Sequence, residues 1–357
     1  MARLDTYFKK LVAVDGSDLH LTSGVVPKMR VHGKLTPLKE DVMPADLLAE
    51  LLDEIFDERQ RRIFNETHDL DMAYELPGVA RFRVSCFQTR LGPAAVFRLI
   101  PEEILPLSKL NVPESILRYT KLRSGLVLVT GPTGSGKSTT LAALIDHINE
   151  HQKRHIVTIE EPIEFVHPNK NSYITQREVG VDCESFSSAL KAASREDGDI
   201  ILVGELRDLD TISQAVTAAE MGNLVFATLH TNSAAKTIDR IIDVFPEDRQ
   251  NQIRIMLSVT LKGICAQLLM PREDGKGRVP VNEILFGSFS LGNIIREGSI
   301  GKIVSLIESG RGEGMALMDD ALMARYKERS ISAETAYLFA DNKQRFEGLP
   351  RGKKKPA

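Results

Sequence analysis

A glycine-rich segment at residues 131–138 carries the residue types and the spacing that bind a nucleoside triphosphate. Its sequence, GPTGSGKS, matches the pattern G-x-x-x-x-G-K-[S/T]. Glycines let backbone N–H groups turn inward around a β-phosphate, a lysine neutralises the β- and γ-oxygens, and a serine hydroxyl holds Mg²⁺. We therefore expect ATP and Mg²⁺ to bind here, with contacts from Gly131, Pro132, Thr133, Gly134, Ser135, Gly136, Lys137, Ser138 and Thr139.

Three further segments place reactive side chains next to apolar runs. Glu205 directly follows one such run, and a carboxylate there can position or deprotonate the attacking water, directly or through Mg²⁺. The segment TIEEPIE at residues 158–164 brings three carboxylates around a proline, and these either order Mg²⁺ and water or form a solvated acidic turn. His230 also follows an apolar run, and it either donates a hydrogen bond to a γ-phosphate or is structural.

The elements that must position these residues can be predicted from the apolar pattern. The short run at residues 126–129 indicates a buried strand before the glycine-rich segment, and residues 139–148 indicate a helix after it. Strands and helices that alternate along a chain predict a mostly parallel sheet covered on both faces, and such sheets bind ligands at the carboxyl ends of their strands. We expect further strands of this sheet at residues 156–159, 200–203 and 224–228, and a mostly helical segment after Phe286.

Composition restricts the class of protein. The chain has 357 residues, of which 42% are hydrophobic and 27% charged, so we expect two globular domains with a small appendage. The formal net charge of -3 provides no general attraction to nucleic acid. The three cysteines lie far apart with no CxxC pair, which fits a reducing cytosol. No window approaches the roughly 20 apolar residues that span a bilayer, so we expect membrane contact to be peripheral.

The N-terminal part has the pattern of a mixed α and β module, followed by a proline-containing linker. We expect helices at residues 4–14 and 44–64, and short strands at residues 19–21, 28–31 and 81–87. The domains that we expect are an N-terminal domain (1–104), an interdomain linker (105–120), an ATPase core (121–286), a C-terminal helical segment (287–345) and a basic flexible tail (346–357).

Taken together and in this order, the four segments resemble those of the secretion-type ATPases that drive type II secretion and type IV pili. They correspond to the Walker A segment, the acidic box, the Walker B segment and the histidine box of that superfamily. The greatest likeness is to the pilus retraction (twitching motility) ATPases of the PilT type, and it extends along nearly the whole chain. The supporting segments are GSDLH (16–20), QREVG (176–180), GELRD (204–208) and AAKTIDRIIDVFP (234–246).

The resemblance implies a fold and a set of roles. The fold would be a PAS-like α+β N-terminal domain followed by a RecA-like P-loop ATPase domain with a helical C-terminal end. Glu205 would be the catalytic glutamate, Glu160 and Glu164 the acidic-box residues, and His230 the sensing histidine. Mg²⁺ would be held by Ser138, Glu160 and Glu205, partly through water. Arginines would stabilise the transferring phosphoryl group, and the matching positions are Arg83, Arg98 and Arg195.

The resemblance also implies an assembly and partners. The chain would form a homohexameric ring with ATP held between neighbouring subunits, and hydrolysis would move the two domains about a hinge near residues 105–113. The motion would be passed to an inner-membrane pilus platform protein, so the expected location is cytoplasmic and peripheral to the inner membrane at the pilus machine. Nucleic acid is not expected as a partner.

Three departures from the family pattern leave an alternative open. Glu161 stands where members usually have aspartate, and Gly198 stands where they have proline. The signature AIRNLIRE of retraction motors corresponds here to SLGNIIRE, in which Gly292 replaces an arginine. The alternative is an accessory PilU-like paralogue that binds ATP and supports a main motor with little turnover of its own. A nucleic-acid translocase of the RecA type is disfavoured by the acidic pI of about 6.3.

Overall fold

The chain divides into two compact units. The computed structural model describes residues 2–100 and 103–349. The first unit comprises Met1–Glu103 and Glu161–Val166, and the second comprises Ile104–Glu160 and His167–Ala357. Residues 350–357 of the expected basic tail lie outside the described residues. Within the described ranges, no helix combines the length and the apolar character that a membrane span requires.

The first unit is built on an antiparallel six-stranded sheet. The strands lie in the order β3-β2-β1-β6-β5-β4. Helix α1 precedes the first strand, and α2 and α3 both lie between β3 and β4 along the chain. Phe8 stacks on Phe82 of β5, and its ring centroid also lies 5.0 Å from that of Phe97 of β6, so these aromatic rings form the core of the unit. The elements are α1 (Asp5–Ala13), β1 (Gly16–Thr22), β2 (Lys28–Val31), β3 (Lys34–Pro37), α2 (Ala45–Asp53), α3 (Glu58–Thr67), β4 (Asp69–Leu76), β5 (Ala80–Thr89) and β6 (Gly92–Ile100).

The helix that we expected at residues 44–64 is in fact two helices. A capping box at Asp57 starts the second one: the Asp57 carboxylate accepts a hydrogen bond from the Gln60 N–H, and the Gln60 side chain accepts one from the Asp57 N–H. This reciprocal pair satisfies two backbone donors at the start of α3, so a second helix begins here after α2 has ended at Asp53.

The second unit contains the expected mostly parallel sheet, with an antiparallel pair at one edge. The strand order is β13-β12-β7-β11-β10-β8-β9, and only β12 and β13 pair antiparallel. Every residue of β7, β10 and β11 is buried, so both faces of these strands are covered. The strands are β7 (Gly125–Thr130), β8 (His155–Glu160), β9 (Tyr173–Glu178), β10 (Ile200–Val203), β11 (Leu224–Leu229), β12 (Leu261–Pro271) and β13 (Arg278–Phe286).

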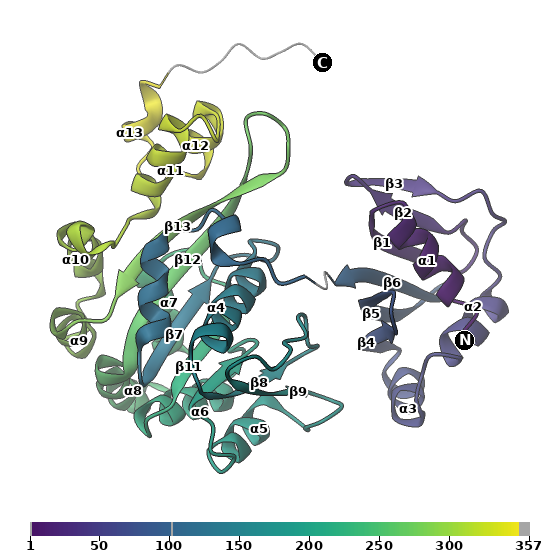
Figure 1. The fold of residues 1–357 in the computed structure, drawn as a ribbon, viewed down its shortest axis with the longest axis horizontal. Helices are drawn as coiled ribbons and strands as arrows, with labels where there is room; N and C mark the ends of the chain where they lie inside the picture. The colour runs from purple at the N-terminus through teal and green to yellow at the C-terminus, as the bar shows by residue number, and fades with distance from the viewer. Residues whose placement is uncertain (1, 101–102, 350–357) are drawn as a thin grey trace. The chain divides into compact units, whose positions relative to one another are not determined.

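Helices connect these strands and then form the C-terminal part. The connecting helices are α4 (Lys137–His151), α5 (Phe186–Ala193), α6 (Leu209–Glu220), α7 (Ala234–Asp243) and α8 (Glu247–Thr260). As predicted, the segment after Phe286 is mostly helical, with α9 (Phe289–Arg296), α10 (Ile303–Ser309), α11 (Met318–Lys327), α12 (Ala333–Phe339) and α13 (Gln344–Glu347). Helices α11, α12 and α13 lie together at one end of the second unit (Figure 1), and they share a small apolar core with β12 and β13.

Part of the segment expected as a linker packs into the core of the second unit. Glu114–Lys121 forms a 3₁₀-helix, and its Ile116 and Tyr119 side chains are buried. The Tyr119 hydroxyl lies 3.1 Å from the carbonyl oxygens of both Ile264 and Leu285. A hydroxyl that donates between two neighbouring strands ties this segment to the sheet, so these residues move with the second unit.

Gly292 lies at a close contact between α8 and α9. It is buried on the face of α9 that meets α8, and a Cβ atom at this position would lie 2.7 Å from the carbonyl oxygen of Ser258. Real Cβ atoms do not approach an oxygen so closely, so the glycine allows the two helices to pack at this distance. The position at which the family signature has an arginine is therefore a helix contact in this chain.

We predict that Gly292→Arg destabilises the second unit by about 3 kcal/mol or more, because the new side chain must separate α8 from α9 or bury a charge between them. The measurement is thermal unfolding of the full chain followed by circular dichroism. Ser290→Arg is the matched control, since Ser290 is exposed on the same helix. An equal melting temperature for both variants would contradict the assignment of Gly292 to a tight contact.

Candidate active site

The glycine-rich segment connects β7 to α4, as predicted, and its glycines adopt conformations that other residues avoid. Gly131, Gly134 and Gly136 have φ angles of +149°, +78° and +83°. A Cβ atom at Gly131 would overlap with the carbonyl oxygen of Gln267, and one at Gly136 would lie 3.0 Å from the Gln267 Nε2. The loop therefore needs glycine for both its backbone angles and its packing.

Lys137 and Ser135 place polar groups inside this loop. The Lys137 ammonium donates hydrogen bonds to the carbonyl oxygens of Gly131 at 2.8 Å and Pro132 at 3.0 Å. The Ser135 hydroxyl is buried and has no hydrogen-bond partner within the described ranges. A buried cation and a hydroxyl without a partner, in a glycine-rich turn that leads into a helix, fit the oxygens of a nucleotide phosphate. Ser138 and Thr139 follow in the first turn of α4.

The loop shares one edge of the sheet with the other predicted segments. Strands β7, β11, β10 and β8 are neighbours and run parallel, so their carboxyl ends meet. Backbone hydrogen bonds continue across these ends: the N–H of Gly131 donates to the carbonyl of Leu229, and the N–H of Leu206 donates to that of Thr228. The structure therefore places Lys137, His230, Glu205 and Glu160 after successive strands of one sheet edge.

Glu205 and His230 are in direct contact. One carboxylate oxygen of Glu205 lies 3.0 Å from the Nε2 atom of His230, and the other lies 2.9 Å from the Nε atom of Arg207. The Glu205 side chain is 21% exposed and so remains accessible to a water molecule. Two partners on opposite oxygens orient this carboxylate. We did not predict Arg207 as a site residue. The available signal was its position two residues after Glu205 in the segment GELRD.

The two acidic-box residues lie in different units. Glu160 ends β8 in the second unit, where it is buried and accepts hydrogen bonds from the Thr158 hydroxyl at 2.7 Å and the Gln176 amide at 3.3 Å. Glu164 belongs to the first unit, where it lies 3.8 Å from a guanidinium nitrogen of Arg83. Of the predicted carboxylates, Glu160 therefore shares its sheet edge with Glu205.

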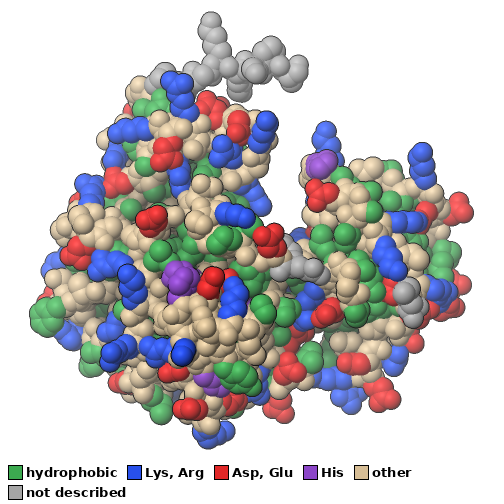
Figure 2. All heavy atoms as spheres, in the orientation of Figure 1, with side chains coloured by type: hydrophobic (Ala, Val, Ile, Leu, Met, Phe, Trp, Pro, Cys, Tyr) green, Lys and Arg blue, Asp and Glu red, His purple; other side chains and the backbone are tan. Residues whose placement is uncertain are grey.

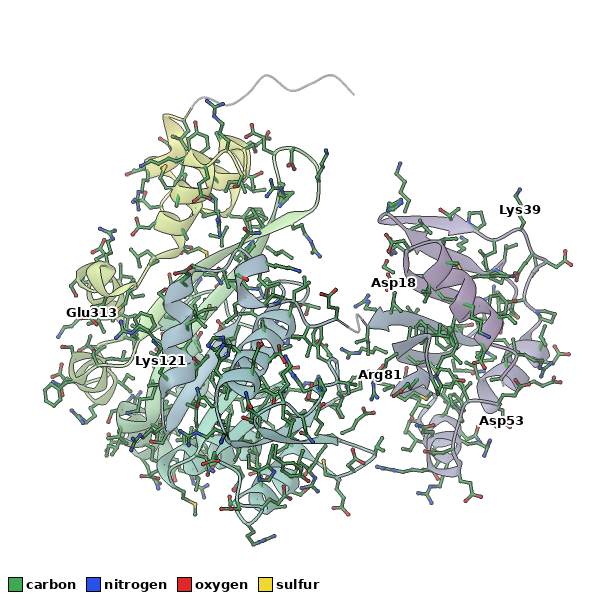
Figure 3. The ribbon with its side chains drawn as sticks, viewed as in Figure 1. Asp18, Lys39, Asp53, Arg81, Lys121 and Glu313 are labelled. Carbon is green, nitrogen blue, oxygen red and sulfur yellow. The ribbon has the colours of Figure 1, made fainter. Side chains whose placement is uncertain are left out.

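Two of the three predicted arginines are cross-strand neighbours. Arg83 on β5 and Arg98 on β6 lie directly opposite each other, so their side chains share one face of the first unit's sheet. Arg98 donates to the buried carboxylate of Asp18 at 2.9 Å (Asp18 is labelled in Figure 3). Arg195 lies in the second unit, exposed in the turn after α5.

The environment of Asp18 favours its charged form. Burial by itself raises the pKa of this carboxyl, but hydrogen bonds from the Ser17 hydroxyl and the Arg98 guanidinium, together with the charge of Arg98, outweigh burial and lower the pKa below its ordinary value. Sequence reasoning noted Asp18 only as part of the GSDLH motif. Its position next to Arg98 depends on the pairing of β1 with β6.

Glu283 on β13 is a further residue that the sequence did not indicate. Its buried carboxylate accepts hydrogen bonds from the backbone N–H of Ala234 at 2.7 Å and of Met318 at 3.3 Å. These residues begin α7, which follows His230 along the chain, and α11. Burial raises the pKa of Glu283, and the two backbone hydrogen bonds oppose that shift. The Glu283 carboxylate therefore joins the start of α7 to the start of α11.

Comparison with known proteins agrees with this arrangement. The sequence profile of a family described as "Type II/IV secretion system protein" matches residues 6–308. The chain belongs to this family. It is 46% identical over 334 residues to a twitching motility protein of Neisseria gonorrhoeae, with 92% of this chain and 89% of that protein covered. It is 47% identical over 320 residues to the type IV pilus retraction ATPase PilT of Pseudomonas aeruginosa, with 90% and 93% covered.

A solved structure and a third relative refine this family placement. The crystal structure of the pilus retraction motor PilT with bound ADP matches with a TM-score of 0.89 and 41% identity, over 98% of this chain and 100% of that one. The present chain therefore has the fold that we predicted, with an N-terminal domain followed by a RecA-like ATPase domain. The type IV pilus ATPase PilU of Pseudomonas aeruginosa is 40% identical over 332 residues, with 93% and 87% covered, which is lower than the value for PilT of the same organism.

We predict that Asp18→Asn lowers the stability of the first unit above about pH 5 and has a progressively smaller effect as the pH falls below about 4. The pKa of Asp18 is lower in the folded chain, so its stabilising contribution is present above the unfolded pKa of about 3.9 and is lost as the pH falls through the folded value. Urea unfolding of both proteins at several pH values measures the difference. A destabilisation that did not change with pH would contradict the ion pair.

Proposed function

We propose that this chain is an ATP-hydrolysing motor that powers the retraction of type IV pili. The observation that carries the proposal is the glycine-lined loop holding Lys137, with the Glu205 and His230 pair at the same edge of the sheet. A loop of this kind binds the phosphates, and a positioned carboxylate nearby supplies the group that activates water. Family membership and the names of the relatives support the retraction of pili as the work performed.

We assign the steps of hydrolysis to residues as follows. Backbone N–H groups of residues 131–138 and the Lys137 ammonium bind the β- and γ-phosphate oxygens, so Lys137 exchanges its loop carbonyl partners for phosphate. Glu205 orients the water and accepts its proton as the water oxygen attacks the γ-phosphorus and the bond to ADP breaks. His230 holds the Glu205 carboxylate in place and would respond to the loss of the γ-phosphate.

The charges on the phosphates call for a metal ion and for cations. When bound with ATP, Mg²⁺ would supply positive charge that offsets the charge of the phosphates. The Ser138 hydroxyl would hold it directly, and Glu160 and Glu205 would do so partly through water.

We assign to Arg83, Arg98 and Arg195 the stabilisation of the negative charge on the transferring phosphoryl group. Because these arginines come from both units, their contact with phosphate would depend on how the units are placed.

The mechanical part of the proposal follows from the division into two units. Each subunit of a homohexamer would close on ATP and relax after phosphate leaves, with the hinge near residues 105–113. The rotation would be passed to an inner-membrane platform protein, and a paralogous motor ATPase is a further partner that we propose. The motor would act in the cytoplasm at the inner-membrane end of the pilus machine.

We predict that Glu205→Gln lowers the turnover of ATP at least about a hundredfold and leaves the affinity for MgADP within about threefold of the original value, because the amide cannot accept the proton from water. Lys137→Ala should instead abolish nucleotide binding. Steady-state phosphate release and calorimetric titration with MgADP measure the two effects. Glu220→Gln, an exposed acid at the end of α6, is the control and should behave as the original chain.

Four results would contradict the proposal. Full turnover in Glu205→Gln, or unchanged MgADP affinity in Lys137→Ala, would remove the catalytic assignment. Weak turnover in the unmodified hexamer would favour the accessory alternative. That alternative is motivated by Gly292, which packs against α8 at the position where the family signature has an arginine. Salt-sensitive binding of DNA would favour a translocase, although the face shown in Figure 2 has basic and acidic side chains interspersed.

A further inference from the structure

Gln267 is a buried polar residue directly beneath the phosphate loop. It lies on β12, which pairs with β7, the strand that leads into the loop. Its side chain is almost completely buried, and so is that of Asn282, its direct cross-strand neighbour on β13. Polar side chains are costly to bury, and a methionine of similar size would fill this position without that cost. The hydrogen bonds of the Gln267 amide explain why a polar residue stands at this buried position.

The amide of Gln267 joins the phosphate loop to the helix that follows it. Its Nε2 donates a hydrogen bond to the carbonyl oxygen of Ser135 at 2.7 Å, within the loop. Its Oε1 accepts hydrogen bonds from the Thr140 hydroxyl on α4 at 2.9 Å and from the Asn282 amide at 2.9 Å. Because the Ser135 partner is a carbonyl oxygen, this network leaves only one orientation for the amide.

The bond to Ser135 determines the direction of the next backbone N–H. In a trans peptide, the C=O of one residue and the N–H of the next point in opposite directions. Since the Ser135 carbonyl is directed at Gln267, the Gly136 N–H is directed away from β12. Gly136 is the last loop residue before α4, where backbone N–H groups meet a phosphate in loops of this class. The backbone of Gln267 also packs against Gly131, so the same residue supports both ends of the loop.

We propose that Gln267 is a positioning residue for the β-phosphate of the bound nucleotide: by holding the Ser135 carbonyl, it keeps the Gly136 N–H turned toward the phosphate. Asn282 holds the Gln267 amide in turn, so β13 is part of the same support. This inference rests on the proposed function, because it assumes that the loop binds a nucleotide. It adds a residue from a strand that carries none of the nucleotide-binding motifs.

The test compares Gln267→Met with Cys265→Ala in the full chain. Methionine keeps the volume of the side chain and removes its hydrogen bonds. Cys265 lies two residues earlier on the same face of β12, is equally buried, and has no hydrogen bond to the loop. Its Sγ accepts a long hydrogen bond of 3.4 Å from the Asn282 amide, and Cys265→Ala removes this contact while the 2.9 Å bond from Asn282 to Gln267 is kept. We expect Gln267→Met to raise both the Kd for MgADP and the KM for ATP about tenfold. We expect kcat to change by less than about threefold, because Glu205 is untouched. Cys265→Ala should leave all three values within about twofold of the original.

A purely structural role would give a different result. Gln267→Met would then lower the melting temperature or the fraction of active protein and leave Kd and KM unchanged, which would overturn the proposal. Should Gln267→Met fail to fold, Asn282→Ala loosens the amide without removing it, and we expect it to raise the Kd for MgADP about threefold. An unchanged Kd in a folded Asn282→Ala protein would then overturn the proposal.

The same titrations separate this inference from the function on which it rests. Failure of the unmodified chain to bind MgADP, or equal binding by Lys137→Ala, would overturn the proposed function and this inference together. Binding and turnover in the unmodified chain that depend on Lys137 and Glu205, combined with original Kd and KM values in Gln267→Met, would overturn this inference alone.

Discussion

The contact between the phosphate loop and β12 is the constraint on which the rest of the site depends. Gly131 leaves β7 so close to the backbone of Gln267 that no side chain fits at that position. This contact fixes where the loop starts, and the first turn of α4 fixes where it ends. Lys137 then lies where its ammonium can reach the loop carbonyls. A loop held at both ends is preorganised for an anion, so little ordering remains to be done when the nucleotide arrives.

The parallel sheet places the other candidate site residues, Glu205 and His230, at the same edge as this loop. Strands β7, β10 and β11 are buried throughout, so the polar side chains that we assign to the nucleotide lie after these strands end. Glu205 and His230 follow adjacent strands, and their contact at 3.0 Å results from that adjacency. The apolar strands thus determine the distance between two groups that lie 25 positions apart in the chain.

Sequence reasoning predicted the part of the site that follows strand ends and missed the part that depends on through-space partners. The residues of the phosphate loop, Glu205 and His230 each follow an apolar run, which is a local signal. Arg207 and Asp18 lie in the segments GELRD and GSDLH, but the sequence does not show which side chains they contact, and no local pattern marks Gln267. The capping box at Asp57 was a readable local signal that we did not use, so one helix was predicted where two exist. The structure gives the positions of the predicted site residues, but the roles of all of them stay predictions: the phosphate loop, Glu205, His230, Glu160, Glu164, Arg83, Arg98 and Arg195.

The antiparallel hairpin of β12 and β13 couples elements that lie far apart in the chain. Through Gln267 it contacts the phosphate loop, and through Glu283 it contacts the start of α7 and the start of α11. β12 and β13 are joined by a continuous register of nine residue pairs from Gly263–Phe286 to Pro271–Arg278, so these contacts all lie on one hydrogen-bonded ladder. If the phosphate loop shifts when a phosphate leaves, the β12–β13 hairpin would carry that shift to the C-terminal helices, and the central strands would not need to move. The outer edge of the sheet would then link the nucleotide site mechanically to the C-terminal part of the subunit.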